Sequence, residues 1–114
     1  MYERITTKDI VALNQLFDKG TVVNVGSLEF AVSQANQQKG WLRQLAIMVR
    51  AILVDHVFEE GNKRTAFAFI TGTLEAQGLV YNRDVVSRCI VNVLKKNVTN
   101  ITDIERSIKD AIRE

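Results

Sequence analysis

Hydrophobic residues recur every three or four positions along most of this chain, which is the spacing of an α-helix with one buried face. Six segments carry the pattern. Their expected limits are Thr6 or Thr7 to Gly20, Ser27 to about Ala35, Trp41 to Val54, Asn62 or Lys63 to Gln77, a fifth from near Asn82 and a sixth from Thr102. The sequence therefore predicts an all-α bundle of about six helices, forming a single domain over residues 1–114.

The third segment is the most hydrophobic of the six, and apolar residues cover most of its circumference. They are Leu42, Leu45, Ala46, Ile47, Met48, Val49, Ile52 and Leu53. A helix that is apolar nearly all round is surrounded by other elements of the fold. We therefore expect this helix to lie at the centre of the core.

The pattern also predicts how several helices begin and end. Leu16 and Phe17 extend the apolar face of the first helix up to Gly20, and glycine is typical of a helix C-terminus. Residues 21–26 are expected to form an extended connection. In the last helix, Thr102-Asp103-Ile104-Glu105 is a capping-box sequence, and the buried face that follows consists of Ile104, Ile108 and Ile112.

Composition narrows the class of protein. The chain has 114 residues, of which 46% are hydrophobic and 25% charged, as in an ordinary soluble domain. Its net charge is +2 and its cations are scattered, so nothing favours direct binding to nucleic acid. No apolar run approaches the roughly 20 residues of a membrane span, and no signal peptide is visible. The single cysteine, Cys89, lies in an apolar helical pattern, so we expect a buried thiol in a cytoplasmic protein.

One polar stretch interrupts the helical pattern, His56-Val57-Phe58-Glu59-Glu60-Gly61-Asn62-Lys63-Arg64. It lies between the third and fourth helices, so the unpaired backbone N–H groups of the fourth helix, at Gly61 to Arg64, face this loop. Such an N-terminus favours anions through its donors and its dipole, and Gly61 lets a phosphate approach the backbone closely. Arg64 adds a planar fork for phosphate oxygens, Lys63 a point charge and Asn62 an amide.

The same stretch carries groups suited to phosphoryl chemistry. Mg²⁺ accompanies phosphate chains and is usually held by one or two carboxylates, and Glu59 and Glu60 are the two carboxylates in the loop. His56 stands one turn earlier and can take a proton from a hydroxyl near neutral pH. Phe58, which lies between the polar residues, is expected to anchor the loop in the core.

A simpler interpretation is also open. A connection between two helices can contain Glu-Glu-Gly-Asn for turn and capping reasons alone, with Lys63 and Arg64 only solvated. A single histidine is more often structural than catalytic. The order of base, acid, glycine, amide and two cations at a helix start nevertheless favours a functional site.

Residues 56–64 resemble the signature loop of the Fic/Doc family, H-x-F-x-[D/E]-G-N-[G/K]-R. Val57 replaces the proline that usually precedes the phenylalanine, a change that does not touch the chemistry. The likeness is strong over the loop and its flanking helices and looser over residues 24–80, where Gly26-Ser27-Leu28-Glu29 is similar to the segment ahead of the family's target-binding flap. It implies a Fic-like helical bundle with a possible short β-hairpin flap near Gln34 to Gly40.

The resemblance also implies a role for each matching residue. His56 would be the general base for a serine, threonine or tyrosine hydroxyl of a target protein, and Glu60 would be the Mg²⁺ ligand. Glu59 falls at a variable position of the family pattern and receives no role. The phosphates of ATP would be bound by Asn62 and Arg64 and by a nest of backbone groups around Gly61 and Lys63. Arg64 would also be a catalytic residue, together with His56.

Two positions distinguish the branches of the family. Most AMP-transferring members have glycine where this chain has Lys63 and a second arginine where it has Phe67. The Doc branch has Asn-Lys-Arg-Thr-Ala, as residues 62–66 do here, and in that branch the nucleotide is thought to bind reversed, presenting its γ-phosphate. The resemblance thus favours a protein kinase, with AMP transfer or a catalytically inactive interaction module as the alternatives.

The chain lacks a recognisable self-inhibitory helix of the form [S/T]-x-x-x-E-[G/N]. The nearest match, Thr71 to Glu75, is followed by Ala76 and lies on a core helix. A small enzyme without a built-in inhibitor resembles the Doc toxins, which a separate antitoxin protein restrains. In that branch the target is a translation factor similar to elongation factor Tu, and its modification stops protein synthesis.

Overall fold

All six predicted helices form in the computed structural model, which describes residues 4–113. They are α1 (Thr7–Asn14), α2 (Val25–Asn36), α3 (Trp41–Leu53), α4 (Asn62–Ala76), α5 (Arg83–Lys95) and α6 (Ile101–Lys109). Two short strands, β1 (Val80–Tyr81) and β2 (Ile112–Arg113), pair antiparallel near the C-terminus, with Tyr81 opposite Ile112. The prediction of a mostly helical single domain is therefore confirmed.

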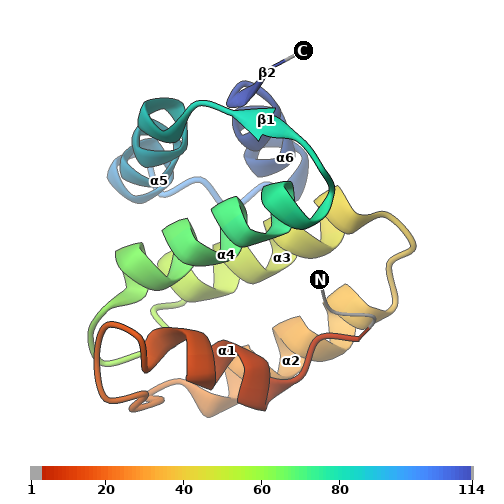
Figure 1. Cartoon of the computed structure of the whole chain (residues 1–114). Coiled ribbons are helices and arrows are strands. Elements are labelled where there is room, and N and C mark those ends of the chain that lie inside the picture. The colour runs from red at the N-terminus through yellow and green to blue at the C-terminus, as the bar shows by residue number, and fades with distance from the viewer. Residues whose placement is uncertain (1–3, 114) are drawn as a thin grey trace.

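The helices stack in three layers (Figure 1). α3 and α4 lie side by side in the middle, α1 and α2 cover one side of this pair, and α5 and α6 cover the other side together with the two strands. α3 contacts α2, α4 and α6, so it is surrounded by other helices. Its central position, predicted from its apolar circumference, is confirmed.

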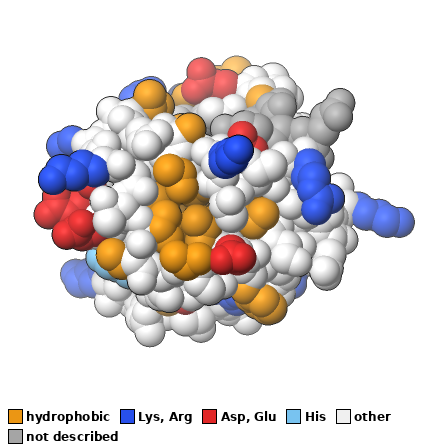
Figure 2. Space-filling view, turned by 90° about the horizontal axis from the view of Figure 1, so that it is seen from below, with side chains coloured by type: hydrophobic (Ala, Val, Ile, Leu, Met, Phe, Trp, Pro, Cys, Tyr) orange, Lys and Arg blue, Asp and Glu red, His pale blue; other side chains and the backbone are white. Residues whose placement is uncertain are grey.

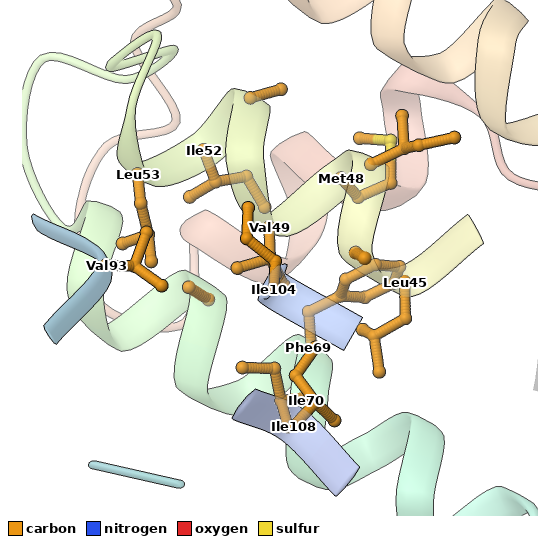
Figure 3. Packing of buried hydrophobic residues seen from close by; sticks show 14 of the residues in the cluster. Leu45, Met48, Val49, Ile52, Leu53, Phe69, Ile70, Val93, Ile104 and Ile108 are labelled. Atoms are coloured by element: carbon orange, nitrogen blue, oxygen red, sulfur yellow. The ribbon is translucent and has the colours of Figure 1, made fainter. Parts of the chain in front are cut away.

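The core is centred on α3 (Figure 3). From Leu45 to Leu53 its side chains are buried on nearly every face, with Arg50 the partly exposed exception. Each fully buried leucine, isoleucine or valine contributes about 1.5–3 kcal/mol relative to an exposed one. The loop between α3 and α4 therefore starts and ends on firmly packed helices. The partners on α4, α5 and α6 include Phe69, Ile70, Val93, Ile104 and Ile108.

α1 ends earlier than its hydrophobic pattern predicts. Thr6 caps its first turn, and its last helical residue is Asn14. Leu16 and Phe17 lie beyond that end and are 71% and 39% exposed, so the prediction that they face inward is wrong. The physical reason is the Asn14 side chain, whose oxygen accepts a hydrogen bond from the Gly20 N–H at 2.8 Å and folds the chain back over residues 15–19.

Residues 34–40 do not form the strand of a flap. Gln34 to Asn36 complete α2, and residues 37–40 form a turn before α3. Within residues 4–113 the one sheet is β1–β2, which lies in another layer, and the one isolated bridge joins Val22 to Phe58. α2 also begins at Val25, two residues before the predicted start, so the extended connection is shorter than expected. α2 continues into the segment where the flap was expected because its buried face has helical spacing. The buried residues of this face are Leu28, Ala31 and Ala35.

The start of α6 differs from the predicted capping box. Asn100 is the capping residue, and its side chain accepts from the backbone N–H of residue 103 at 3.1 Å. Arg43 of α3 engages the two predicted capping side chains instead, donating to the Thr102 hydroxyl at 3.3 Å and to the Glu105 carboxylate at 2.9 Å. Ile112 lies in β2 and not on the helix, because α6 ends three residues before it.

Cys89 lies on the buried face of α5, as its apolar neighbours predict. Burial raises the pKa of its thiol. A buried thiol with a raised pKa is a packing group and not a nucleophile. Separately, none of the helices in the described part of the chain has the length and hydrophobicity needed to cross a membrane.

Candidate functional site

The polar stretch forms the loop from α3 to α4, and its backbone is tied to the segment that precedes α2. Phe58 is wholly buried and forms an antiparallel backbone bridge with Val22. The Val23 N–H donates to the Val57 carbonyl at 2.8 Å, and the Glu59 N–H donates to the Thr21 carbonyl at 3.0 Å. Phe58 therefore anchors the loop in the core, as predicted.

Asn62 closes the loop on itself through a pair of hydrogen bonds. Its Oδ1 accepts from the Phe58 N–H at 3.0 Å, and its Nδ2 donates to the Phe58 carbonyl at 2.8 Å. The residue is buried. Its side chain thus holds the backbone of the loop, and only its backbone N–H remains available to a ligand. The sequence suggested that the Asn62 amide binds a phosphate, whereas in the structure it binds the backbone of Phe58.

Asn14, at the end of α1, fixes the other side of the loop. It is wholly buried, and its Nδ2 donates to the Glu60 carbonyl and to the Thr65 hydroxyl, each at 3.0 Å. Its Oδ1 accepts from the Gly20 N–H. One side chain thereby joins the end of α1 to both ends of the Glu60–Thr65 segment. Sequence reasoning missed it, because a single asparagine on an amphipathic helix carries no local signal of a contact 46 residues away.

Gly61 is the N-cap residue of α4 and has a left-handed backbone, with φ of 80° and ψ of 11°. A Cβ added there would lie 3.0 Å from Asn14 Nδ2 and 3.3 Å from Asp18 Cβ. Both the backbone conformation and the contact with α1 therefore require glycine. The sequence suggested that Gly61 lets a phosphate approach the backbone closely. In the fold, the groups that approach the Gly61 backbone closely are Asn14 of α1 and Asp18 in the segment after it.

Gly61→Ala is expected to lower the free energy of unfolding by about 1–3 kcal/mol, because it combines a left-handed backbone with a tight contact to the Asn14 side chain. Urea unfolding followed by circular dichroism measures the change. Gly72→Ala in the same helix is the matched control. Nothing lies within 4 Å of the Cβ it adds, so it is expected to raise stability by about 0.5–1 kcal/mol. Equal effects at the two positions would contradict the assigned role of Gly61.

The N-terminus of α4 offers free donors. The first hydrogen bond within the helix runs from the Thr65 N–H to the Gly61 carbonyl, at 2.9 Å. Among residues 4–113, no side chain caps this helix end, and no hydrogen bond uses the backbone N–H groups of Gly61, Asn62, Lys63 or Arg64. Unpaired donors aligned with a helix dipole form a site that favours anions.

A cavity of about 540 Å³ lies over this helix end. It brings together every residue that the sequence proposed for the site, namely His56, Glu60, Gly61, Asn62, Lys63 and Arg64. Its remaining walls are Phe17, Asp18 and Leu94. Glu59, which received no role, is not among the lining residues. A volume of this size is within the range of small-molecule sites, which is roughly 300–1,000 Å³.

Asp18 is the charged residue of the cavity that sequence reasoning missed. It follows α1 in the turn that Asn14 closes, and its Cβ would be 3.3 Å from a side chain at position 61. It adds a second carboxylate beside Glu60. In the described part of the chain no three acidic, histidine or cysteine side chains gather as a preformed metal cage. One or two carboxylates with room for phosphate oxygens and water fit Mg²⁺, which rarely uses an all-protein cage.

His56 has an unusual backbone. Its φ is +54°, in the left-handed region where residues other than glycine pay a steric cost. The residue follows the end of α3, and its exposed side chain lines the cavity. In Figure 2 the single histidine lies at the edge of the lower face, beside acidic and basic side chains and near a gathering of hydrophobic ones. Strained backbone held in place by a rigid surround occurs frequently at functional sites.

Comparison with known proteins gives no match. No family model fits the chain, and neither a curated protein nor a solved structure resembles it significantly. The likeness of residues 56–64 to the Fic/Doc loop therefore stays a prediction.

Proposed function

We propose that this protein is a Doc-like toxin that transfers the γ-phosphate of ATP to a hydroxyl of a translation factor similar to elongation factor Tu. The observation that carries the proposal is the single cavity over the uncapped start of α4. That cavity holds an exposed imidazole, two carboxylates, two cations and a row of free backbone donors. These are the parts that phosphoryl transfer uses, because its catalysis is mostly positioning and charge stabilisation.

The phosphate chain of ATP would lie at the N-terminus of α4. The free N–H groups there would donate to phosphate oxygens, and the guanidinium of Arg64 and the ammonium of Lys63 would neutralise their charge. Both side chains are exposed and line the cavity, and neither forms an ion pair in the described residues. They are therefore free to bind a ligand.

His56 would act as the general base. Its imidazole takes the proton from the target hydroxyl while that oxygen forms a bond to the γ-phosphorus. The bond from the γ-phosphorus to the bridging oxygen breaks, and ADP leaves with the electron pair. Mg²⁺, when bound, lowers the charge that builds on the phosphate oxygens, and Glu60 would hold it, with Asp18 on the same cavity wall.

Two side chains favour transfer of the γ-phosphate over transfer of AMP. Lys63 lines the cavity and fills space that a glycine would leave open to the nucleotide. Phe67, one turn further along α4, is apolar where AMP-transferring relatives of the Fic type have an arginine, so it cannot bind a phosphate. A reversed nucleotide, with its terminal phosphate toward His56, suits this arrangement. AMP transfer and an inactive interaction module remain as outcomes of the test below.

We also propose a cellular location and a regulatory partner for the enzyme. A single buried thiol agrees with the reducing cytoplasm, where translation factors are found. The segment nearest to a self-inhibitory motif, Thr71 to Glu75, lies within α4, and Thr71 hydrogen-bonds to the carbonyls of Phe67 and Ala68. That segment is part of the packed helix and not a free inhibitor. We therefore propose a separate antitoxin protein as the partner that restrains the activity.

ATP labelled at either the α- or the γ-phosphate distinguishes the alternatives. The purified protein is incubated with each form, Mg²⁺ and a bacterial extract, and labelled proteins are identified by mass. Label from the γ-position in one protein, lost in His56→Ala, is the expected result. Label from the α-position would establish AMP transfer instead. No label from either form, in an extract containing elongation factor Tu, would reject the proposed kinase and leave the interaction module.

A further inference from the structure

A second cavity adjoins the first. It has a volume of about 300 Å³ and shares three of its walls with the larger cavity, namely Phe17, Lys63 and Arg64. Its remaining lining is Phe67, Ser87, Ile90 and Val91. The two cavities are therefore neighbours at the start of α4. One is lined mainly by charged and polar side chains and the other mainly by hydrophobic ones.

The second cavity forms where stripes on two helices face each other. Lys63 and Phe67 are one turn apart on α4, and Ser87 and Val91 are one turn apart on α5, so each pair lies on one face of its helix. Phe17 closes the end, because the early stop of α1 leaves it outside the core.

Phe67 is held in place from outside the cavity. The guanidinium of Arg83, at the start of α5, lies over its ring at 5.0 Å from the centroid. Arg83 is not among the residues that line the cavity. A cation over the face of an aromatic ring is attracted to it and favours this orientation of the ring. Arg83 thus covers one face of the Phe67 ring, and the ring also lines the cavity.

We propose that the nucleobase of ATP binds in this second cavity, between α4 and α5, while its phosphates bind in the first. The inference rests on the proposed function and adds to it the place and the specificity of the base. A nucleotide has the required shape, with a charged chain at one end and a flat aromatic group at the other. Phe17 and Phe67 supply surfaces on which a base can stack.

The same lining predicts weak discrimination between bases. Among the described residues that line the cavity, Ser87 is the one uncharged polar side chain. Strong discrimination requires several placed hydrogen-bonding groups that a wrong base leaves unpaired. One hydroxyl can donate or accept and so suits either purine. ATP and GTP are therefore expected to bind with affinities within about fivefold of each other.

Calorimetric titration with two probes tests the inference. Mg²⁺-ATP carries both the base and the phosphates, and Mg²⁺-tripolyphosphate carries the phosphates alone. Phe67→Ala is expected to weaken ATP binding about tenfold, because stacking on an aromatic side chain is lost, and to leave tripolyphosphate binding unchanged. Ser87→Trp, on the exposed side of α5, fills the cavity without removing a packed group and is expected to have the same selective effect.

A pair of matched valines provides the control. Val91 lines the cavity and is 55% exposed, whereas Val25 at the start of α2 is 53% exposed and lines neither cavity. Val91→Ser is expected to weaken ATP binding, and Val25→Ser is not. If wild-type protein binds ATP no more tightly than tripolyphosphate, the base site is wrong and the phosphate site stands. If it binds neither probe, the proposed function fails as well.

Discussion

His56→Gly is expected to lower the rate of phosphoryl transfer by about 10²–10⁴-fold while making the protein more stable. The loss follows from removing the proposed general base from the cavity. The gain follows from the backbone at His56, where φ is +54°. Glycine adopts that conformation without steric cost, which stabilises the folded state. Glycine also raises the entropy of the unfolded chain, which offsets part of this effect. The free energy of unfolding is therefore expected to rise by about 0.5–1 kcal/mol.

Two further variants separate the two effects. His56→Ala removes the imidazole but keeps a Cβ in the left-handed region, so transfer falls equally and stability stays within about 0.5 kcal/mol of wild type. Asn97 also has a positive φ, of 50°, and it does not line the cavity, although it follows the cavity residue Leu94 by three positions. Asn97→Gly is expected to leave transfer unchanged and to stabilise less than His56→Gly, because asparagine already tolerates this backbone.

The measurements are γ-phosphate incorporation for transfer and urea unfolding for stability. Transfer that persists in both His56 variants would show that His56 is not the base. A His56→Gly protein no more stable than His56→Ala would show that the left-handed backbone carries no strain. The two results are independent, so either half of the prediction can fail alone.

Asn14→Ala is expected to destabilise the protein by about 2–4 kcal/mol, the largest stability effect among the site residues. Three hydrogen bonds are lost, to the Glu60 carbonyl, the Thr65 hydroxyl and the Gly20 N–H. The Asn14 side chain is wholly buried, so water cannot fully replace the hydrogen bonds that its three partner groups lose. Urea unfolding followed by circular dichroism gives the value.

Asn24→Ala is the matched control for Asn14→Ala. Asn24 also connects to the same loop, through a 2.8 Å bond from its Nδ2 to the Asp55 carbonyl, but it is exposed. Its replacement is expected to cost less than about 1 kcal/mol, since water can take over the bond. Asn14→Asp keeps an acceptor for Gly20 but loses the donor to Glu60, so it should not restore stability. Restoration by aspartate would mean that the bond to Gly20 is the one that matters.

The number and order of the helices could be predicted from the sequence because a helix with one buried face has a regular spacing of hydrophobic residues within its own segment. The three-to-four spacing of apolar residues marks each segment, and the unusually apolar residues 41–53 mark the central helix. The candidate site was also local. Its imidazole, carboxylate, glycine and two cations fall within nine consecutive positions and line one cavity.

Contacts between distant segments decided the rest. Asn14 stops α1 and leaves Phe17 exposed, because its side chain bonds to Gly20 and across to Glu60. Arg43 of α3 takes the side chains that would have formed a capping box in α6. These hydrogen bonds depend on which polar groups come close together once the helices pack, and the hydrophobic periodicity of the sequence does not predict them.

The site itself shows the same division. The sequence alone determined which residues meet at the start of α4, since they are neighbours along the chain. Only the tertiary structure decided that the Asn62 side chain holds the loop, that Asp18 adds a second carboxylate, and that Lys63 also lines a second, more hydrophobic cavity. Neighbours in sequence are close in any fold, whereas residues of α1, α4 and α5 come together only when packing aligns their faces.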